Sequence, residues 1–222
     1  MSSVVSPGFR QRVRSGVEPF ARLFGRVGLT PNALTLIGFG IAVGAAYAAA
    51  TQAWLAAGLL VAFGAVFDLF DGALARATNK TSRFGAFMDS TFDRAGEAVV
   101  YIGLIISLYH IGVLSGPVLA ASAMASAFMV SYVRAKSESL GFAPGTGMAS
   151  VGLAPREVRV VILSVGLIVA GLTVGPPQLV VPYFWWTALV TSLALIAILA
   201  TVTTIQRIFF VYRQSKTQEV ND

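Results

Sequence analysis

The sequence predicts an all-α integral membrane protein with six transmembrane helices, preceded by a cytoplasmic interfacial amphipathic helix. Three observations lead to this prediction. Hydrophobic residues make up 56 % of the 222 residues and charged residues only 12 %, against about 25 % charged residues in a soluble domain. The mean hydropathy is +0.76. Finally, the apolar residues gather in six stretches, and every lysine and arginine is expected on one side of the resulting bundle.

The six stretches have the length of membrane spans, since a bilayer needs about 20 apolar residues in a helix. We expect one domain over residues 1–222, with the six-helix bundle at 32–210 and a cytoplasmic tail at 211–222. The predicted spans are Ala33–Ala50, Trp54–Arg76, Gly85–Tyr109, Val113–Ala135, Val158–Val174 and Pro182–Phe210.

An amphipathic helix is expected at residues 8–28, ahead of the first span. Large apolar residues recur there at spacings of three and four, and arginines occupy positions between them, which is typical of a helix lying in the membrane interface. Pro19 either kinks this helix or begins it. Packing of the segment against the bundle is an equal alternative. The apolar positions are Phe9, Val13, Val17, Phe20 and Phe24.

The distribution of positive charge predicts the orientation. All sixteen lysines and arginines precede the first span, follow the last, or flank the second and fourth connections. The opposite connections, near Gln52, His110 and Pro176–Pro177, carry none. By the positive-inside rule the basic side is cytoplasmic, which places both termini in the cytoplasm and the protein in the cell (inner) membrane. We expect no nucleic-acid partner, because the chain has no separate basic domain.

Four carboxylates interrupt the apolar sequence near the predicted cytoplasmic face: Asp68, Asp71, Asp89 and Asp93. A carboxylate within a membrane helix costs about 2.5–3.5 kcal/mol on insertion scales, so these residues require a compensating cation. The first two are spaced i, i+3 and the last two i, i+4, so each pair shares one face of its helix. Hard oxygen ligands favour Mg²⁺ or Mn²⁺, and four carboxylates can hold two ions.

These aspartates belong to a longer pattern, D-x2-D-G-x2-A-R-x8-G-x3-D-x3-D, with eight fixed positions. The pattern resembles the signature of the CDP-alcohol phosphotransferase family, whose members have six transmembrane helices after an interfacial helix and form homodimers. The resemblance implies transfer of a phosphatidyl-type group from a CDP-linked lipid to an alcohol, with release of CMP. It assigns metal binding to the four aspartates, and the role of general base to Asp93. The CDP-lipid would be held by Pro31, Asn32, Ala33, Leu34, Gly72, Ala75, Arg76, Ser82 and Gly85.

A second basic cluster predicts the acceptor. The stretch SYVRAKSESLG…VGLAPREVR resembles the corresponding part of bacterial and archaeal phosphoinositol transferases. Several cations bind a phosphomonoester well, so we expect CDP-diacylglycerol to react with myo-inositol phosphate, giving phosphatidylinositol phosphate. Alternatively, these cations serve topology alone. The expected acceptor ligands are Tyr132, Arg134, Lys136, Arg156 and Arg159.

Other functions stay open at this stage. Glycerol 3-phosphate also carries a phosphomonoester, and an ether-lipid donor leaves little trace in sequence. Intramembrane prenyltransferases also pair aspartates with Mg²⁺, but without the D-G-x2-A-R element. A cation transporter would need polar groups across the bilayer. Glu97 continues the face of Asp89 and Asp93 by one turn, and we expect it to pair with an arginine rather than a metal.

Chelation is expected to abolish turnover. Removing divalent metal with EDTA takes away the positive charge that neutralises the pyrophosphate oxygens. The measurement is CMP release before chelation, after it, and after Mg²⁺ or Mn²⁺ is added back. Activity that survives complete metal removal contradicts the two-metal prediction.

Overall fold

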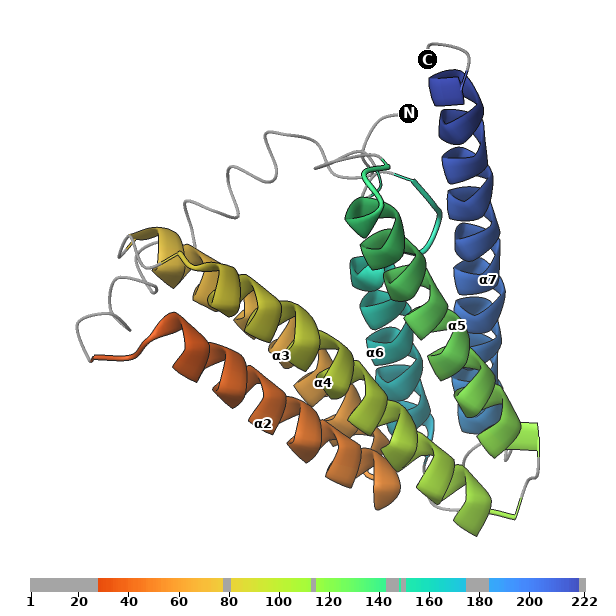
Figure 1. Ribbon diagram of the computed structural model, residues 1–222. Helices are drawn as coiled ribbons and strands as arrows, with labels where there is room; N and C mark the ends of the chain where they lie inside the picture. The colour runs from red at the N-terminus through yellow and green to blue at the C-terminus, as the bar shows by residue number, and fades with distance from the viewer. Residues whose placement is uncertain are drawn as a thin grey trace, which may run out of the picture.

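The computed structural model describes residues 28–77, 81–112, 115–142, 148, 151–174 and 184–219. The predicted interfacial helix at 8–28 therefore lies outside the described part, apart from its last residue. The described residues form six α-helices and no β-strand (Figure 1). The helices are α2 (Pro31–Ala50), α3 (Trp54–Ala77), α4 (Arg83–His110), α5 (Ser115–Ser139), α6 (Arg156–Thr173) and α7 (Phe184–Glu219).

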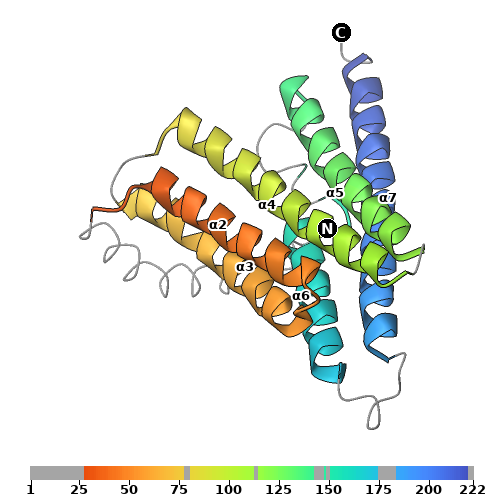
Figure 2. The same ribbon diagram turned by 90° about the horizontal axis from the view of Figure 1, so that it is seen from below.

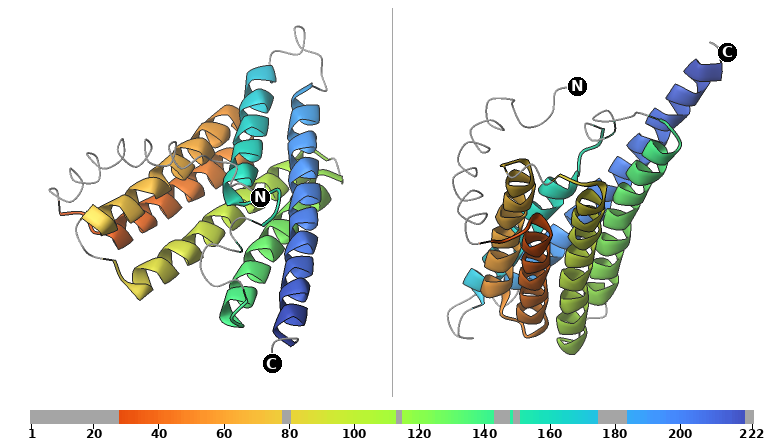
Figure 3. Two further views of the ribbon diagram at one scale, coloured as in Figure 1. Left: turned by 90° about the horizontal axis from the view of Figure 1, so that it is seen from above. Right: turned by 60° about the vertical axis from the view of Figure 1, so that its left-hand side comes forward.

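The six helices coincide with the six predicted apolar stretches, with two extensions. Helix α5 continues to Ser139, one turn beyond the expected end at Ala135. Helix α7 continues to Glu219, so residues 211–219 are helical and extend the last helix beyond the expected limit of the bundle at 210. In Figure 3 this end of α7 projects beyond the other helices.

Local capping explains where α2 and α4 begin. The Thr30 hydroxyl accepts a hydrogen bond from Ala33 N at 3.2 Å, directly before Pro31 at the first helical position. The Ser82 hydroxyl accepts one from Gly85 N at 2.9 Å. Both caps satisfy amide groups that have no partner within the helix. They place the first turns of α2 and α4 at the same end of the bundle.

The most extensive contacts join helices that are not consecutive in the chain, α2 with α4 and α5 with α7, and the consecutive pairs α2–α3, α4–α5 and α6–α7 also pack together. In Figure 1, α2, α3 and α4 follow one diagonal, while α6 and α7 stand more upright. Figure 2 shows α2 beside α3 and α5 beside α7. Contacts of α3 with α6 and of α4 with α5 join the two groups. The main core consists largely of Leu and Ala side chains, with Trp54 and Tyr101 fully or almost fully buried.

Four of the six helices are long and apolar enough to cross a membrane: α2, α3 over Trp54–Arg76, α5, and α7 over Trp186–Thr217. Helices α4 and α6 are not in this set. Each carries a group of charged residues in its N-terminal half, including Asp93 and Glu97 in α4 and Arg156 and Arg159 in α6. The structure thus supports a multi-pass membrane protein, and the charges that set these two helices apart lie at the site described below.

Helices α2 and α4 approach each other closely at Gly103. A β-carbon at this position would overlap the carbonyl of Ala46, lying 2.9 Å from its carbon and 3.0 Å from its Cα. Since these are backbone atoms, only a shift of one helix could relieve the overlap. Glycine at a helix contact lets backbones approach in this way.

Gly103→Ala is expected to lower the melting temperature of the purified protein, because overpacking costs about 1–3 kcal/mol. Thermal unfolding in one detergent measures the effect. The matched control is Gly40→Ala in α2, where a β-carbon meets no atom within 4 Å, and which should cause no loss. Equal melting temperatures for the two variants would contradict the close approach.

Candidate active site

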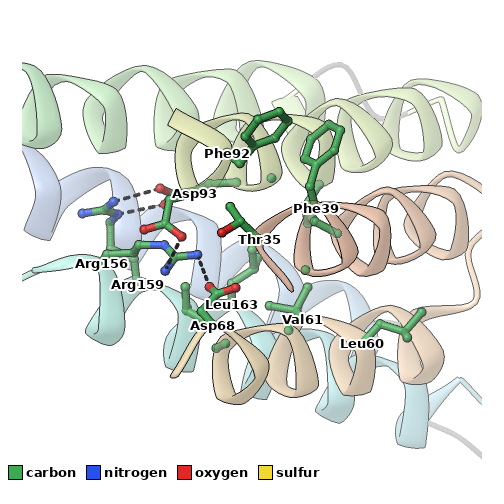
Figure 4. A pocket seen from close by; sticks show the side chains of 18 of the residues that line it. Thr35, Phe39, Leu60, Val61, Asp68, Phe92, Asp93, Arg156, Arg159 and Leu163 are labelled. Carbon is green, nitrogen blue, oxygen red and sulfur yellow. Dashed lines mark hydrogen bonds and ion pairs between the residues drawn. The ribbon is translucent and has the colours of Figure 1, made fainter. Parts of the chain in front are cut away.

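A cavity opens between α2, α3, α4 and α6 (Figure 4). Its apolar wall includes Phe39 and Phe92, whose rings meet edge to face with centroids 5.1 Å apart. The charged residues of the cavity come from three helices. They are Asp68 from α3, Asp89, Asp93 and Glu97 from α4, and Arg156 and Arg159 from α6. The cavity therefore combines an apolar interior with a concentration of charge, as a site for an amphiphilic substrate requires.

Arg156 bridges two of the predicted metal ligands. Its Nη2 donates to Asp68 Oδ2 at 2.8 Å, and its Nη1 lies 3.1 Å from Asp93 Oδ1. The side chains are partly buried, with exposed fractions of 29 % for Arg156, 24 % for Asp68 and 17 % for Asp93. The guanidinium thus supplies, in this structure, the positive charge that two carboxylates from different helices require.

Asp93 lies within reach of a second cation. Arg94 Nη1 lies 3.4 Å from Asp93 Oδ2 and donates to the Ser90 carbonyl at 2.9 Å. Each oxygen of Asp93 therefore faces one arginine. Such a carboxylate can exchange partners when another cation or a hydroxyl donor enters the cavity.

The donor set has the chemistry of a site for a hard divalent cation. Asp68, Asp89 and Asp93 line one cavity and offer only carboxylate oxygens, which suits Mg²⁺ or Mn²⁺. Asp71 lies on α3 one turn after Asp68, with its side chain outside the described part. Among the described residues no three acidic side chains are grouped closely enough to hold an ion in the present arrangement. Arg156 lies between two of them and pairs with one oxygen of Asp68 and one oxygen of Asp93.

The predicted CDP-lipid ligands gather at two helix ends. Asn32 and Ser82 both approach Gly85: a β-carbon there would lie 3.5 Å from Asn32 Oδ1 and 3.1 Å from Ser82 Oγ. Pro31, Ala33 and Leu34 form the same first turn of α2 as Asn32. The first turns of α2 and α4 thus lie side by side, and the positive ends of two helix dipoles favour anions there.

Gly72 and Arg76 form a second part of this predicted ligand set on α3. A β-carbon at Gly72 would lie 3.3 Å from Arg76 Nη1. The guanidinium therefore folds back over the glycine, one turn earlier on the same face. Ala75 is partly buried beside them.

Arg159 is placed differently from the prediction. It was expected to bind the acceptor phosphate, but its side chain is only 1 % exposed and is already fully engaged. Its Nε and Nη2 donate to the two carboxylate oxygens of Glu97 at 3.0 and 2.9 Å, and its Nη1 donates to the Ala154 carbonyl at 3.0 Å. The expectation that Glu97 pairs with an arginine is confirmed. This engagement does not support direct phosphate contact by Arg159.

The three predicted acceptor ligands on α5 do not converge. Because α5 stays helical to Ser139, Tyr132 and Lys136 share a face while Arg134 points elsewhere. Arg134 pairs with Glu138 at 3.0 Å with 41 % of its side chain exposed. No α5 residue lines the cavity described above. Of the five predicted acceptor ligands, the structure brings Arg156 to the carboxylates and leaves the α5 group apart.

A family model for CDP-alcohol phosphatidyltransferases matches residues 28–213. The chain belongs to this family. An archaetidylinositol phosphate synthase of Pyrococcus horikoshii is 34 % identical over 90 % of this chain and 93 % of its own. A phosphatidylinositol phosphate synthase of Streptomyces avermitilis is 35 % identical over 90 % of this chain and 79 % of its own.

Solved structures show the same fold. The phosphatidylinositol phosphate synthase of Mycobacterium tuberculosis with CDP-DAG bound superimposes with a TM-score of 0.75 at 28 % identity, covering 88 % of this chain and 93 % of that one. Its complex with manganese and citrate gives a TM-score of 0.73 at 27 % identity, over 88 % of each chain. A divalent metal thus accompanies this fold in a relative.

The prediction from sequence missed the contribution of α2 to the cavity of this CDP-alcohol phosphatidyltransferase. Thr35 and Gly38 line it, and a β-carbon at Gly38 would lie 3.1 Å from Asp68 Oδ1. Gly38 thus makes room for an aspartate on the neighbouring helix. The available signal was a small residue, Gly38, about two turns after the capped start of α2, which by itself indicates helix packing only.

Asp93→Asn is expected to retain the fold and abolish turnover, since the amide keeps the size of the side chain but cannot accept a proton from a hydroxyl. CMP release and the melting temperature are measured on the same preparation. Asp222→Asn, at the C-terminal residue, is the matched control for loss of one carboxylate. A near-normal rate for Asp93→Asn would remove Asp93 as the base.

Proposed function

We propose that this family member transfers the phosphatidyl group of CDP-diacylglycerol to myo-inositol phosphate, giving phosphatidylinositol phosphate and CMP. The observation that carries the proposal is the Asp68–Arg156–Asp93 bridge at the cavity. It places the proposed base beside a guanidinium that can exchange a carboxylate for a phosphomonoester. Carboxylates and phosphates are the two anions that a guanidinium binds best.

The relatives support the product class. The names of the archaeal and bacterial relatives both specify an inositol phosphate head group and differ in the lipid. The mycobacterial structure contains CDP-DAG. We therefore propose a diacyl donor, with the ether-lipid donor as an outcome of the assay below.

The site residues have three different roles in this proposal: metal binding, CDP-lipid binding and proton transfer. Asp68, Asp71, Asp89 and Asp93 hold two Mg²⁺ or Mn²⁺ ions, which when bound neutralise the pyrophosphate oxygens. Residues 31–34, Gly72, Ala75, Arg76, Ser82 and Gly85 bind the CDP-lipid. Asp93 accepts the proton of the inositol hydroxyl. The hydroxyl oxygen bonds the phosphorus that carries diacylglycerol, the pyrophosphate P–O bond breaks, and CMP leaves with the electron pair.

Arg156 is the proposed primary ligand of the acceptor phosphate, with Lys136, Tyr132 and Arg134 of α5 reaching it after movement of that helix end. The arrangement in the membrane is also proposed: six spans, with the site and both termini cytoplasmic. Support comes from the charges of α4, α6 and the chain ends, which all lie on the side expected to be basic. A homodimer is proposed from the family resemblance.

The decisive assay measures CMP release by purified protein with CDP-diacylglycerol and Mg²⁺. Inositol phosphate, glycerol 3-phosphate, free inositol and serine are compared as acceptors. Release with inositol phosphate alone supports the proposal. Release only with glycerol 3-phosphate would make the protein a phosphatidylglycerophosphate synthase. Absence of release with every acceptor requires the archaeal ether-lipid donor to be tested, and then cation transport.

Arg156→Ala is expected to raise the KM for inositol phosphate by about tenfold or more, because hydrogen bonds to charged groups contribute about 1.5–3 kcal/mol. The KM for the CDP-lipid should change less. Steady-state kinetics with each substrate varied in turn measures both. Arg213→Ala, an exposed arginine near the end of α7, is the matched control for loss of one charge. Equal effects on both KM values would contradict an acceptor role for Arg156.

A further inference from the structure

Two salt bridges join α4 to α6 as consecutive rungs. Asp93 and Glu97 are four residues apart on α4, and Arg156 and Arg159 are three apart on α6, so each pair shares a face of its helix. The outer rung joins Asp93 to Arg156 and the inner rung joins Glu97 to Arg159. Helix α6 packs mainly against α3 and α7, and these two ion pairs connect its first turn to α4.

The two rungs differ in how firmly they are held. The inner rung is bidentate and nearly excluded from solvent, and Arg159 uses its third donor group on the Ala154 carbonyl. In the outer rung, Arg156 uses only Nη1 on Asp93, while its Nη2 pairs with Asp68. Its Nε is buried without a hydrogen-bond partner among the described residues. Arg156 therefore keeps one donor group, its Nε, that no described residue uses, whereas all three donor groups of Arg159 are engaged.

The backbone ahead of α6 is anchored from α7. The Thr203 hydroxyl accepts hydrogen bonds from Leu153 N and Ala154 N at 3.0 and 2.9 Å. The buried Arg207 donates to the carbonyls of Val151 and Val130 at 3.0 and 2.7 Å. These hydrogen bonds hold the segment to α7, and the Glu97–Arg159 pair connects the first turn of α6 to α4.

We infer that Glu97 and Arg159 are positioning residues for the transfer reaction: their ion pair holds the first turn of α6 at the position relative to α4 at which Arg156 reaches both the base Asp93 and the acceptor phosphate. The inference rests on the proposed acceptor role of Arg156. Under this inference the two arginines of α6 have different functions: Arg156 contacts the reacting groups, and the buried Arg159 positions Arg156. Displacement of a catalytic group by about 1 Å can reduce a rate by about 10²-fold.

Conservative variants test the pair kinetically. Glu97→Asp shortens the side chain by one methylene. Arg159→Lys keeps the charge but removes the two parallel hydrogen bonds from the guanidinium to Glu97. Each is expected to lower kcat/KM for inositol phosphate by about tenfold or more, while the KM for the CDP-lipid stays within about twofold. An equal rise in the KM values for inositol phosphate and for the CDP-lipid would overturn the inference.

A double-mutant cycle separates positioning from general stability. If the pair acts through Arg156, then Glu97→Asp and Arg159→Lys should cause little further loss of kcat/KM in an Arg156→Ala background. The control is Leu189→Ala, which destabilises the α7 core away from the cavity and should show the same effect in both backgrounds. Full additivity for the Glu97 and Arg159 variants would overturn the inference.

A distance measurement tests the position of α6 relative to α4 without any substrate. The chain contains no cysteine, so spin labels can be attached through Ile102→Cys on α4 and Val161→Cys on α6, both exposed positions. The distance distribution between the labels should shift or broaden with Glu97→Asp or Arg159→Lys, and stay unchanged with Leu189→Ala. An unchanged distribution in the Glu97 and Arg159 variants would overturn the inference.

The CMP-release assay and the label-distance measurement together distinguish this inference from the proposed function. If the wild-type protein releases no CMP with inositol phosphate, the acceptor assignment fails. A label distance that still depends on Glu97 and Arg159 would then support their role in positioning α6. The cycle is repeated with whichever acceptor is active.

Discussion

The structure depends on the neutralisation of carboxylates at one end of an apolar bundle. Asp68 and Asp93 come from different helices and face each other, and their charge is balanced by Arg156 from a third. Breaking such a pair when it is buried costs about 3–5 kcal/mol, because a charge is left without a partner. The positions of the two carboxylates and of the Arg156 guanidinium are therefore linked.

This constraint explains why α6 begins where it does. Its first residue, Arg156, must lie beside α3 and α4, and the preceding backbone is held by Thr203 and Arg207 of α7. A helix from late in the chain thereby completes a site whose acidic residues come from the middle of the chain. The long α7 packs against α5 and α6 and so supports the helix that brings Arg156 to the site.

The same charges account for the uneven hydropathy of the helices. Helices α4 and α6 carry the acidic and basic residues of the site, and they are the two that fall short of a membrane span by composition. In a bundle their charged turns face the cavity, while the apolar remainder packs in the core. Charge at the cavity is thus tolerated in a membrane protein because neighbouring helices supply the partners.

The sequence alone determined the six helices, the family and the aspartate pattern, because each depends on local periodicity or on fixed spacing along one or two helices. The distinct roles of Arg156 and Arg159 could not be predicted. Both lie on one face of α6, and only the packing of α4 shows that one meets Glu97 in the interior and the other meets Asp68 and Asp93 at the cavity. The divergence of Tyr132, Arg134 and Lys136 also appeared only with the continued α5 helix. Spacing along a helix determines which side chains share a face, whereas the partner of a charged side chain depends on which other helix packs against that face, and this is decided by tertiary structure.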